Sequence, residues 1–328
     1  MGEFDLIDLI RAHTALSRGD VALGIGDDAA LLTPPPGQQL VVCIDTLAEG
    51  VHFSVGTAPD DLGWKSLAVN LSDLAAMGAT PAWALLALTL PQADARFVEH
   101  FADGFAQLAR QFNLALVGGD TTWGSLTVTV SVLGFVPEGR ALLRADAKVG
   151  DAVFVTGTLG DAAAALRCLD RNDPRANTLL SAPSTTREEL IARLNRPQPR
   201  IAAGLALRDV AGACIDVSDG LVADLAHVCE ASGVGAEIDV DALPMSSALL
   251  ELFEPAERRD FALSGGDDYE LCFTASVDRA DRIAADFARL GYGATRIGRI
   301  VAQPGVRVHD AHGNTIDTPR RGWQHFGA

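Results

Sequence analysis

The sequence predicts a mixed α/β fold in two domains, and three observations support this prediction. Helical and strand patterns alternate along the chain from end to end. The length of 328 residues is typical of two domains of ordinary size. Residues 137–150 have the character of a junction, since they begin with Pro137 and end with Gly150. We therefore expect one domain at residues 1–147 and a second at residues 148–328.

The composition narrows the class of protein. A net charge of −17, with no basic tract, disfavours nucleic acid and anionic membranes as partners. Five scattered cysteines without a C-x-x-C pair are typical of reduced thiols in a cytoplasmic protein. The acidic N-terminus lacks the apolar run of a signal peptide, and the longest apolar run, residues 82–90, is too short to span a bilayer. We expect a cytoplasmic protein.

The first half is expected to alternate helices and strands. Pro59 suits a first helical turn and Gly78 a C-terminal stop, which predicts a helix between them. Phe97, Phe101 and Phe105 fall on one helical face. In order, we expect a helix at 4–13, a glycine-rich loop at 24–28, strands at 29–32 and 40–44, the helix ending at Gly78, a strand at 83–90, a helix at 95–112, a strand at 114–117 leading into a loop at 118–122, and an alternating strand at 126–136.

The helix that ends at Gly78 is predicted to be amphipathic. Leu67, Leu71 and Leu74 form an apolar stripe, while Asn70 and Asp73 fall on a different stripe. A buried carboxylate without a partner is costly. Asp73 is therefore expected either to face water or to have a cation as its partner.

The second half continues the alternation of strands and helices. We expect strands at 152–155, 213–217 and 271–274, further strands after Gly293, an Ala-rich helix ending at 169, helices at 187–194, 201–210 and 278–290, and a helix that Ser218-Asp219-Gly220 opens and that runs to about 232. Residues 170–186 lack periodicity and are expected to form a surface loop.

Acidic residues lie where α/β proteins place ligand groups. Six of them are expected in glycine-rich turns or at strand ends, and one lies within a helix: Asp28, Asp45, Asp120, Asp216, Asp219 and Asp267, with Asp73 in the helix. A single such site is usually only a turn, but seven with few nearby bases favour shared divalent cations. Oxygen ligands without a Cys/His set favour Mg²⁺ or Mn²⁺.

A Mg²⁺-binding cleft in an acidic protein suggests a phosphorylated substrate, with glycines that let backbone N–H groups approach phosphate. The sequence contains no P-loop, no complete G-x-G-x-x-G and no protein-kinase signature set. Any nucleotide site must therefore be of another type.

The ordered motifs resemble those of the thiamine-monophosphate kinase family, in the superfamily that includes aminoimidazole ribonucleotide synthetase. The matching segments are Gly24-Ile25-Gly26-Asp27-Asp28-Ala29-Ala30, Asp45-Thr46-Leu47, residues 49–53 and 70–79, Gly118-Gly119-Asp120-Thr121, Asp216-Val217-Ser218-Asp219-Gly220-Leu221, residues 264–271 and Trp323-Gln324-His325-Phe326. They occur in family order over nearly the whole length.

The resemblance implies transfer of the ATP γ-phosphoryl group to thiamine phosphate by direct in-line transfer, assisted by several Mg²⁺ ions. It also implies an N-terminal domain that forms a homodimer through its strands and a C-terminal domain that completes the active-site cleft. By motif, the implied Mg²⁺ ligands are Asp28, Asp45, Asp73, Asp120, Asp216 and Asp219; the ATP contacts are Gly119, Asp120, Arg144 and Ser218; and the thiamine phosphate contacts are His52, Asp267 and Trp323.

The nucleophile in this reaction is a phosphate oxygen that is already anionic, so no residue is expected to act as a general base. Mg²⁺ held by Asp45 and Asp120, together with the fork-shaped cation Arg144, is expected to neutralise the phosphate charge instead. Without the resemblance, Arg144 and His52 read as surface residues and Trp323 as a packing residue.

The chain departs from the family pattern in three places. Cys43-Ile44 stands where Ser or Thr is common, Asp267 where Glu is common, and Trp123 where some members have a basic residue. Two other functions stay open: another ATP-dependent synthetase of the same superfamily, and a non-enzymatic, acidic protein that binds divalent cations.

Overall fold

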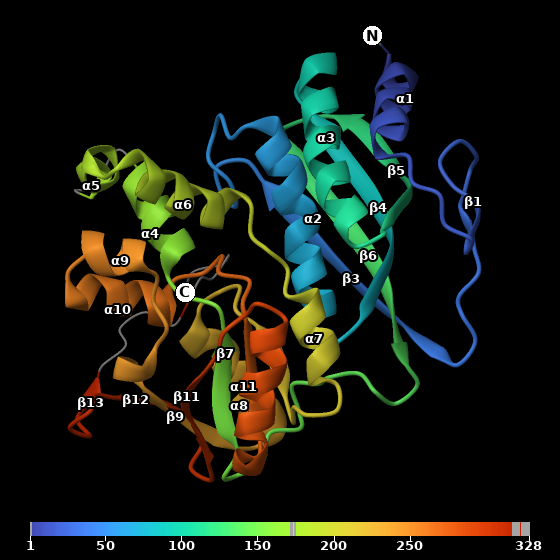
Figure 1. Cartoon of the computed structure of the whole chain (residues 1–328). Coiled ribbons are helices and arrows are strands. Elements are labelled where there is room, and N and C mark those ends of the chain that lie inside the picture. Colours follow the sequence, from blue (N-terminus) through green and yellow to red (C-terminus); the bar gives the residue numbers. More distant parts are fainter. Residues whose placement is uncertain (1, 171–172, 174, 317–321, 323–328) are drawn as a thin grey trace. The chain divides into compact units, whose positions relative to one another are not determined.

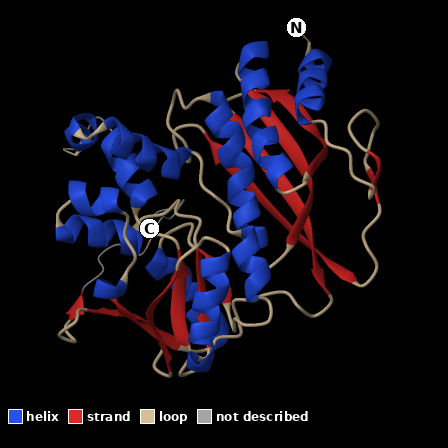
Figure 2. Ribbon diagram, viewed as in Figure 1, coloured by secondary structure: helices blue, strands red, loops and turns tan. Residues whose placement is uncertain are grey.

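The structure is a computed structural model (Figure 1), and it describes residues 2–170, 173, 175–316 and 322. The chain forms two compact units, Met1–Leu74 with Ala79–Ala141, and Ala75–Gly78 with Leu142–Ala328. Each unit combines helices with strands (Figure 2), which confirms the predicted mixed α/β class. Across the described residues, no helix is both long enough and apolar enough to cross a membrane.

The first unit contains most of the long elements. In chain order they are α1 (Glu3–Thr14), β1 (Val21–Leu23), β2 (Leu31–Leu32), β3 (Gln38–Ala48), α2 (Pro59–Ala76), β4 (Thr80–Leu90), α3 (Ala95–Gln111), β5 (Ala115–Trp123) and β6 (Thr127–Pro137). The predicted helix at 95–112 is confirmed by α3, whose Phe101 and Phe105 are fully buried.

The main sheet of the first unit has the strand order β3-β6-β4-β5. β6 pairs antiparallel with β3 and β4, and β4 pairs parallel with β5. α2 and α3 cover one face (Figure 1), where alternate side chains such as Leu86, Val128 and Val130 are buried. The opposite face carries Val42 and Ile44, whose side chains are 56% and 65% exposed.

The helix α2 has different surroundings from those predicted. Its bounds agree with the prediction, but residues 62–72 are all buried, so the expectation of an amphipathic helix is wrong. The buried polar groups bond along the helix, since Ser66 Oγ donates to Gly63 O at 3.0 Å and Asn70 Nδ2 donates to Ser66 O at 3.1 Å. These bonds offset the cost of burying Ser66 and Asn70. Asp73 is half-buried.

The second unit contains shorter elements. They are β7 (Ala152–Thr156), α4 (Asp161–Leu169), α5 (Ala176–Ser181), α6 (Ser184–Asn195), α7 (Ile201–Leu207), β8 (Cys214–Asp216), α8 (Leu221–Ser232), β9 (Gly235–Asp239), η1 (Val240–Ala242), α9 (Ser247–Leu252), α10 (Pro255–Ser264), β10 (Leu271–Ala275), η2 (Val277–Arg279), α11 (Ala280–Arg289), β11 (Ala294–Val301), β12 (Gly305–His309) and β13 (Thr315–Ile316).

The sheet of the second unit has the order β13-β12-β9-β11-β7-β10-β8. β12 pairs parallel with β9, and the other neighbours pair antiparallel. One core, which includes Val153, Ile215 and Leu225, joins the sheet to α8. A second core, which includes Leu190 and Phe261, lies among α4, α6, α9 and α10.

Three sequence expectations about element boundaries are wrong. β5 continues to Trp123, so residues 118–122 lie in a strand and not in a loop. β3 continues past Asp45 to Ala48, so Asp45 lies within the strand. In both cases the pairing of long neighbouring strands overrides the local signal of a glycine or an acid. Within residues 170–186, α5 and the start of α6 replace the expected loop.

Candidate active site

The glycine-rich loop of the first unit connects β1 to β2 and carries Asp28. Gly26 has a φ of 124°, which L side chains rarely adopt. A Cβ atom there would lie 3.1 Å from Nη1 of Arg11 on α1, so the guanidinium packs against the loop. Asp28 is exposed, and its N–H donates to Oδ1 of Asp27 at 2.8 Å. The loop thus presents Asp28 to solvent, while Arg11 packs against Gly26.

Asp45 and Asp73 belong to one region of the first unit. Cys43 lies on β3 with Sγ 3.4 Å from the carbonyl oxygen of Asn70 on α2. Asp45 follows Cys43 by two residues and so shares its strand face, which is the face toward α2, and Asp73 follows Asn70 by three. Burial raises the pKa of the Asp45 carboxyl above its ordinary value. A cation at this carboxylate would therefore relieve an unfavourable charge.

Asp120 lies across the same sheet from Asp45. Asp120 pairs with Ala87 on β4, which pairs with Thr129 on β6 and then with Thr46 on β3. Asp45 precedes Thr46 by one residue on β3. Because successive side chains on a strand point to opposite faces, the carboxylates of Asp45 and Asp120 face opposite sides of the sheet. With β6 and β4 between them, their backbones are separated by three strand spacings, roughly 14 Å. Within one copy, a single Mg²⁺ cannot bind both side chains, because its ligands lie about 2.1 Å away.

Gly119 allows the close strand pairing beside Asp120. A Cβ atom at Gly119 would lie 1.8 Å from the carbonyl oxygen of Leu86, which excludes any side chain. Asp120 itself is exposed, and Oδ1 accepts a hydrogen bond from the N–H of Thr121 at 3.0 Å. Asp120 thus presents an exposed carboxylate on the edge strand β5, which is a chemically suitable site for a metal-bound phosphate.

His52 is held in the turn that follows β3. The N–H of Ala48 donates to Nδ1 of His52 at 3.0 Å, and the N–H of His52 donates to the carbonyl oxygen of Ala48 at 3.0 Å. Because Nδ1 accepts this bond, the neutral ring carries its proton on Nε2. Nε2 is therefore the donor that His52 can offer to a phosphate.

In the second unit, Asp216 and Asp219 flank a loop that Asp224 organises. Oδ2 of Asp224 accepts hydrogen bonds from the N–H groups of Ser218, Asp219 and Gly220 at 3.0, 3.1 and 3.1 Å. Burial, and then the charges of Asp216 and Asp219, raise the pKa of Asp224 to about 7. Three acids thus crowd together where β8 meets α8. Sequence analysis missed Asp224, although an acid in the first turn of a helix is a recognisable signal.

Asp267 lies in the loop between α10 and β10. Its φ is 68°, and the hydroxyl of Tyr269 donates to its Oδ1 at 2.8 Å. Glu270 follows in the chain and is fully buried, where it accepts hydrogen bonds from Arg193, Arg200 and the hydroxyl of Thr156. The Arg200 bonds and charge hold the pKa of Glu270 below its ordinary value in spite of its burial. Sequence analysis missed both Tyr269 and Glu270.

The two remaining predicted residues lie at the ends of the second unit. Leu143 pairs with Ala213, and the N–H of Cys214 donates to the carbonyl oxygen of Leu143, so Arg144 lies beside the start of β8. The Arg144 side chain is exposed. Trp323 falls outside the described residues.

The donor set fits Mg²⁺ in its chemistry, because every predicted ligand offers carboxylate oxygen. The raised pKa of Asp45 and the crowding around Asp224 indicate negative charge that a cation would stabilise. Among the described residues, no three His, Cys, Asp or Glu side chains already stand close enough to hold a metal ion. The ligand set therefore stays a prediction.

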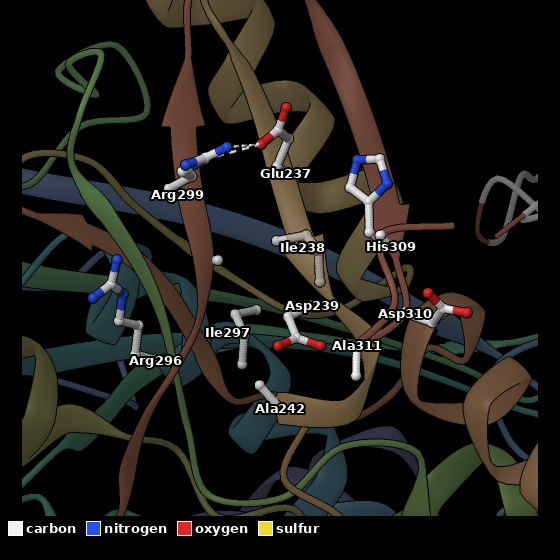
Figure 3. A pocket seen from close by; sticks show the side chains of 12 residues that line it. Glu237, Ile238, Asp239, Ala242, Arg296, Ile297, Arg299, His309, Asp310 and Ala311 are labelled. Carbon is white, nitrogen blue, oxygen red and sulfur yellow. Dashed lines mark hydrogen bonds and ion pairs between the residues drawn. The ribbon is translucent and has the colours of Figure 1, made fainter. Parts of the chain in front are cut away.

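A pocket of about 680 Å³ lies elsewhere, on the sheet of the second unit (Figure 3). β9, β11 and β12 line it, and it contains none of the predicted site residues. Two of its charged groups already pair, since Arg299 donates to Glu237 at 2.7 and 2.9 Å. We do not assign the reaction to this pocket.

Comparison with known proteins identifies the family to which this chain belongs. The AIR synthase related protein family matches twice, with its N-terminal domain at residues 26–136 and its C-terminal domain at residues 148–311. The protein named thiamine-monophosphate kinase in Salmonella typhimurium is 48% identical over 329 aligned residues, which cover 99% of this chain and 98% of that protein. The chain belongs to the thiamine-monophosphate kinase family.

Solved structures agree with this assignment. The crystal structure of thiamine-monophosphate kinase from Stenotrophomonas maltophilia K279a has a TM-score of 0.86 and 53% identity, and the match covers 94% of this chain and 96% of that one. AaThiL complexed with AMPPCP and TMP has a TM-score of 0.77 and 35% identity, with coverage of 99% and 97%. The predicted fold and family are therefore confirmed.

Proposed function

We propose that the chain phosphorylates thiamine phosphate with ATP, giving thiamine diphosphate and ADP. The observation that carries this proposal is that the chain belongs, over nearly its whole length, to a family whose members are named for this activity. The AaThiL complex supports both substrates, since AMPPCP is an ATP analogue and TMP is the acceptor in the same molecule.

In the proposed reaction, a phosphate oxygen of thiamine phosphate attacks the γ-phosphorus of ATP. A new P–O bond forms as the bond from the γ-phosphorus to the oxygen bridging it to the β-phosphorus breaks, and that oxygen leaves with ADP. The attacking oxygen is anionic near neutral pH, so no side chain has to remove a proton. The obstacle is repulsion between two polyanions, and the protein contributes positioning and neutralisation of charge.

Each residue has a proposed role that suits the chemistry of its side chain or backbone. Nε2–H of His52 donates to the phosphate of thiamine phosphate, while Arg144 donates two N–H groups to ATP phosphate oxygens. Asp267 accepts from the amino group of the pyrimidine, and Trp323 packs against the thiamine rings. Gly119 and Ser218 offer backbone and hydroxyl donors to ATP. The carboxylates that would hold Mg²⁺, which would supply positive charge to offset the repulsion of the phosphates, are Asp28, Asp45, Asp73, Asp120, Asp216 and Asp219.

We also propose that the chain acts as a homodimer through the sheet of the first unit. The exposed Val42 and Ile44 on the open face of this sheet support a protein partner there, because soluble monomers rarely leave large apolar patches in water. Sedimentation should give twice the chain mass, and Val42→Glu should give a monomer; a wild-type monomer would refute the dimer.

A further proposal concerns location. All five cysteines are free of disulfide bonds, which supports the reducing environment of the cytoplasm.

ADP release tests the proposed activity. The wild-type protein should release ADP only when ATP, Mg²⁺ and thiamine phosphate are all present, and mass spectrometry should find thiamine diphosphate. Thiamine and 5-aminoimidazole ribonucleotide precursors serve as control acceptors. Equal ADP release without thiamine phosphate would refute the kinase activity, and turnover with another acceptor alone would favour a different synthetase.

A further inference from the structure

The loop at residues 264–270 contains a hydrogen bond that the proposed function leaves without a role. Tyr269 is 7% exposed, and its hydroxyl donates to Oδ1 of Asp267 at 2.8 Å. Asp267 is the residue proposed to contact thiamine phosphate. A hydrogen bond to a charged carboxylate is stronger than one between neutral groups, so it fixes the orientation of that carboxylate.

The backbone around this bond is strained. Asp267 and Tyr269 have φ values of 68° and 51°, in the left-handed region. Asp tolerates this region, whereas an aromatic residue does so rarely. Such conformations persist only where surrounding contacts enforce them, and they gather at ligand-binding sites. The strain at Tyr269 therefore requires contacts that hold the loop in this shape.

On one side, the loop is bonded to the segment that carries the proposed ATP and Mg²⁺ contacts. The N–H of Asp267 donates to the carbonyl oxygen of Ser218 at 2.9 Å, and the N–H of Tyr269 donates to that of Val217 at 2.8 Å. A Cβ atom at Gly266 would lie 2.4 Å from the same Ser218 oxygen, so the two segments are in close contact. The backbone of Asp267 is thus tied directly to Ser218.

On the other side, both neighbours of Tyr269 are anchored. The buried Asp268 accepts the N–H of Gly160 with both carboxylate oxygens, at 3.0 and 2.9 Å. Glu270 is fully buried and accepts from Nε of Arg200 at 2.6 Å. Tyr269 cannot move far without breaking these bonds. Its hydroxyl is consequently a fixed donor, and the Asp267 side chain is the part of the loop that it orients.

We propose that Tyr269 is a positioning residue for thiamine phosphate, whose hydroxyl holds the Asp267 carboxylate in the orientation that accepts the substrate's amino group. This inference rests on the proposed function and adds a residue to it. The Asp side chain has only two rotatable bonds, so one hydrogen bond restricts much of its freedom. Tyr269 itself does not touch the reacting phosphates.

Steady-state kinetics of Tyr269→Phe tests this role. The substitution removes one hydroxyl and keeps the buried ring. We expect the KM for thiamine phosphate to rise about tenfold, as for the loss of one charge-assisted hydrogen bond. The kcat, the KM for ATP and the melting temperature should stay close to the wild-type values, because the phosphoryl-transfer contacts are unchanged.

Two further variants separate positioning from a structural effect. Tyr292→Phe is the matched control: its ring lies against Arg200, 4.9 Å from the guanidinium carbon, at the far end of the contacts that anchor Glu270. A general loosening of the loop would raise the KM in both variants, whereas positioning raises it in Tyr269→Phe alone. In an Asp267→Ala background, Tyr269→Phe should add nothing to the KM, because the hydroxyl acts through the missing carboxylate.

The outcomes distinguish this inference from the activity on which it rests. Wild-type turnover together with an unchanged KM in Tyr269→Phe would overturn the role of Tyr269 alone. An equal KM rise in Tyr292→Phe, or a further rise when Tyr269→Phe is added to Asp267→Ala, would do the same. Absence of wild-type turnover would overturn the proposed function and this role with it.

Discussion

The two units hold their proposed functional acids in opposite ways. In the first unit, Asp28 and Asp120 are exposed, with few bonds to the rest of the unit beyond those to neighbouring backbone. In the second unit, Asp216 is 4% exposed and Asp224 accepts three backbone N–H groups from the adjoining loop. In the second unit, hydrogen bonds within the chain organise the loop at residues 217–220, whereas Asp28 and Asp120 of the first unit are exposed to solvent.

This difference has an energetic meaning. Ordering a loop costs conformational entropy. In the second unit, buried hydrogen bonds and ion pairs offset that cost when the chain folds. In the first unit, the carboxylates of Asp28 and Asp120 are exposed, so binding of a ligand is expected to restrict these side chains. Stability should therefore depend more on the buried charges of the second unit, such as Glu270, than on the exposed acids of the first.

The largest expected effect tests the buried ion pairs of the second unit. Glu270→Gln leaves Arg193 and Arg200 without their shared carboxylate, and breaking a buried pair in this way costs about 3–5 kcal/mol. Glu237→Gln is the matched control, because Glu237 pairs with the 64%-exposed side chain of Arg299 in the same sheet. Its loss should cost at most about 1 kcal/mol. Urea unfolding measures the free energy of unfolding of both variants, and equal losses of stability would contradict the difference between the buried and the exposed ion pair.

Asp45→Asn tests the first unit, where charge should serve catalysis and not stability. We expect kcat to fall by about 10²–10³, as for other groups that stabilise developing charge. Because burial raises the pKa of Asp45, its charge weakens folding; that penalty grows as pH rises from about 3.8 toward the folded-state pKa and is complete above it. The neutral Asn should therefore leave the melting temperature unchanged or higher. Asp103→Asn, at an exposed carboxylate on α3 that pairs with His13 at 2.7 Å, is the control; it should leave kcat unchanged and cost at most about 1 kcal/mol of stability.

Hydrogen exchange compares the loops of the two units directly. With Mg²⁺ and AMPPCP, amides at residues 24–30 should gain protection of about tenfold or more, because binding orders the exposed loop. Amides at residues 266–270 should change less, since Ser218 and Val217 already accept two of them. Equal gains in both segments would remove the distinction between the units.

The smallest expected effect concerns pH and a residue outside either site. Hydrogen bonds from Arg18 hold the pKa of Asp20 below its ordinary 3.8. The folded-state pKa is lowered, so this carboxylate stabilises the protein above about pH 3.8, and the stabilisation is lost as pH falls through the folded-state value. Asp20→Asn should cost about 1 kcal/mol or less near neutral pH. In urea unfolding, this difference should shrink below about pH 3.8, and a constant difference would contradict the assignment.

Long periodic segments were predictable from the sequence, and short or paired ones were not. α3 and β6 follow from repeated Phe and alternating Val. Residues 118–122 looked like a loop because of two glycines, yet pairing with β4 makes them a strand. The burial of α2 could not be read from its sequence either, because the polar groups of Ser66 and Asn70 find partners within the helix itself.

The motifs of the site were predictable from the sequence, but the strand order and the long-range contacts that position them were not. Asp45 and Asp120 are both visible in the sequence, but the order β3-β6-β4-β5 that separates them is not. The partners of Glu270 are equally hidden, since Arg193 and Arg200 are 77 and 70 residues away along the chain. Long-range pairing of this kind leaves no local periodicity to detect.

A crystal structure with Mg²⁺, thiamine phosphate and a non-hydrolysable ATP analogue is the most direct test of the central claim, that the acidic residues of the predicted ligand set bind Mg²⁺. We predict Mg²⁺ bound by Asp45 and Asp120 from the first unit and by Asp216 and Asp219 from the second, with a second copy of the chain contributing at the sheet of the first unit. Phosphates held by basic side chains, with these carboxylates free of metal, would contradict the account.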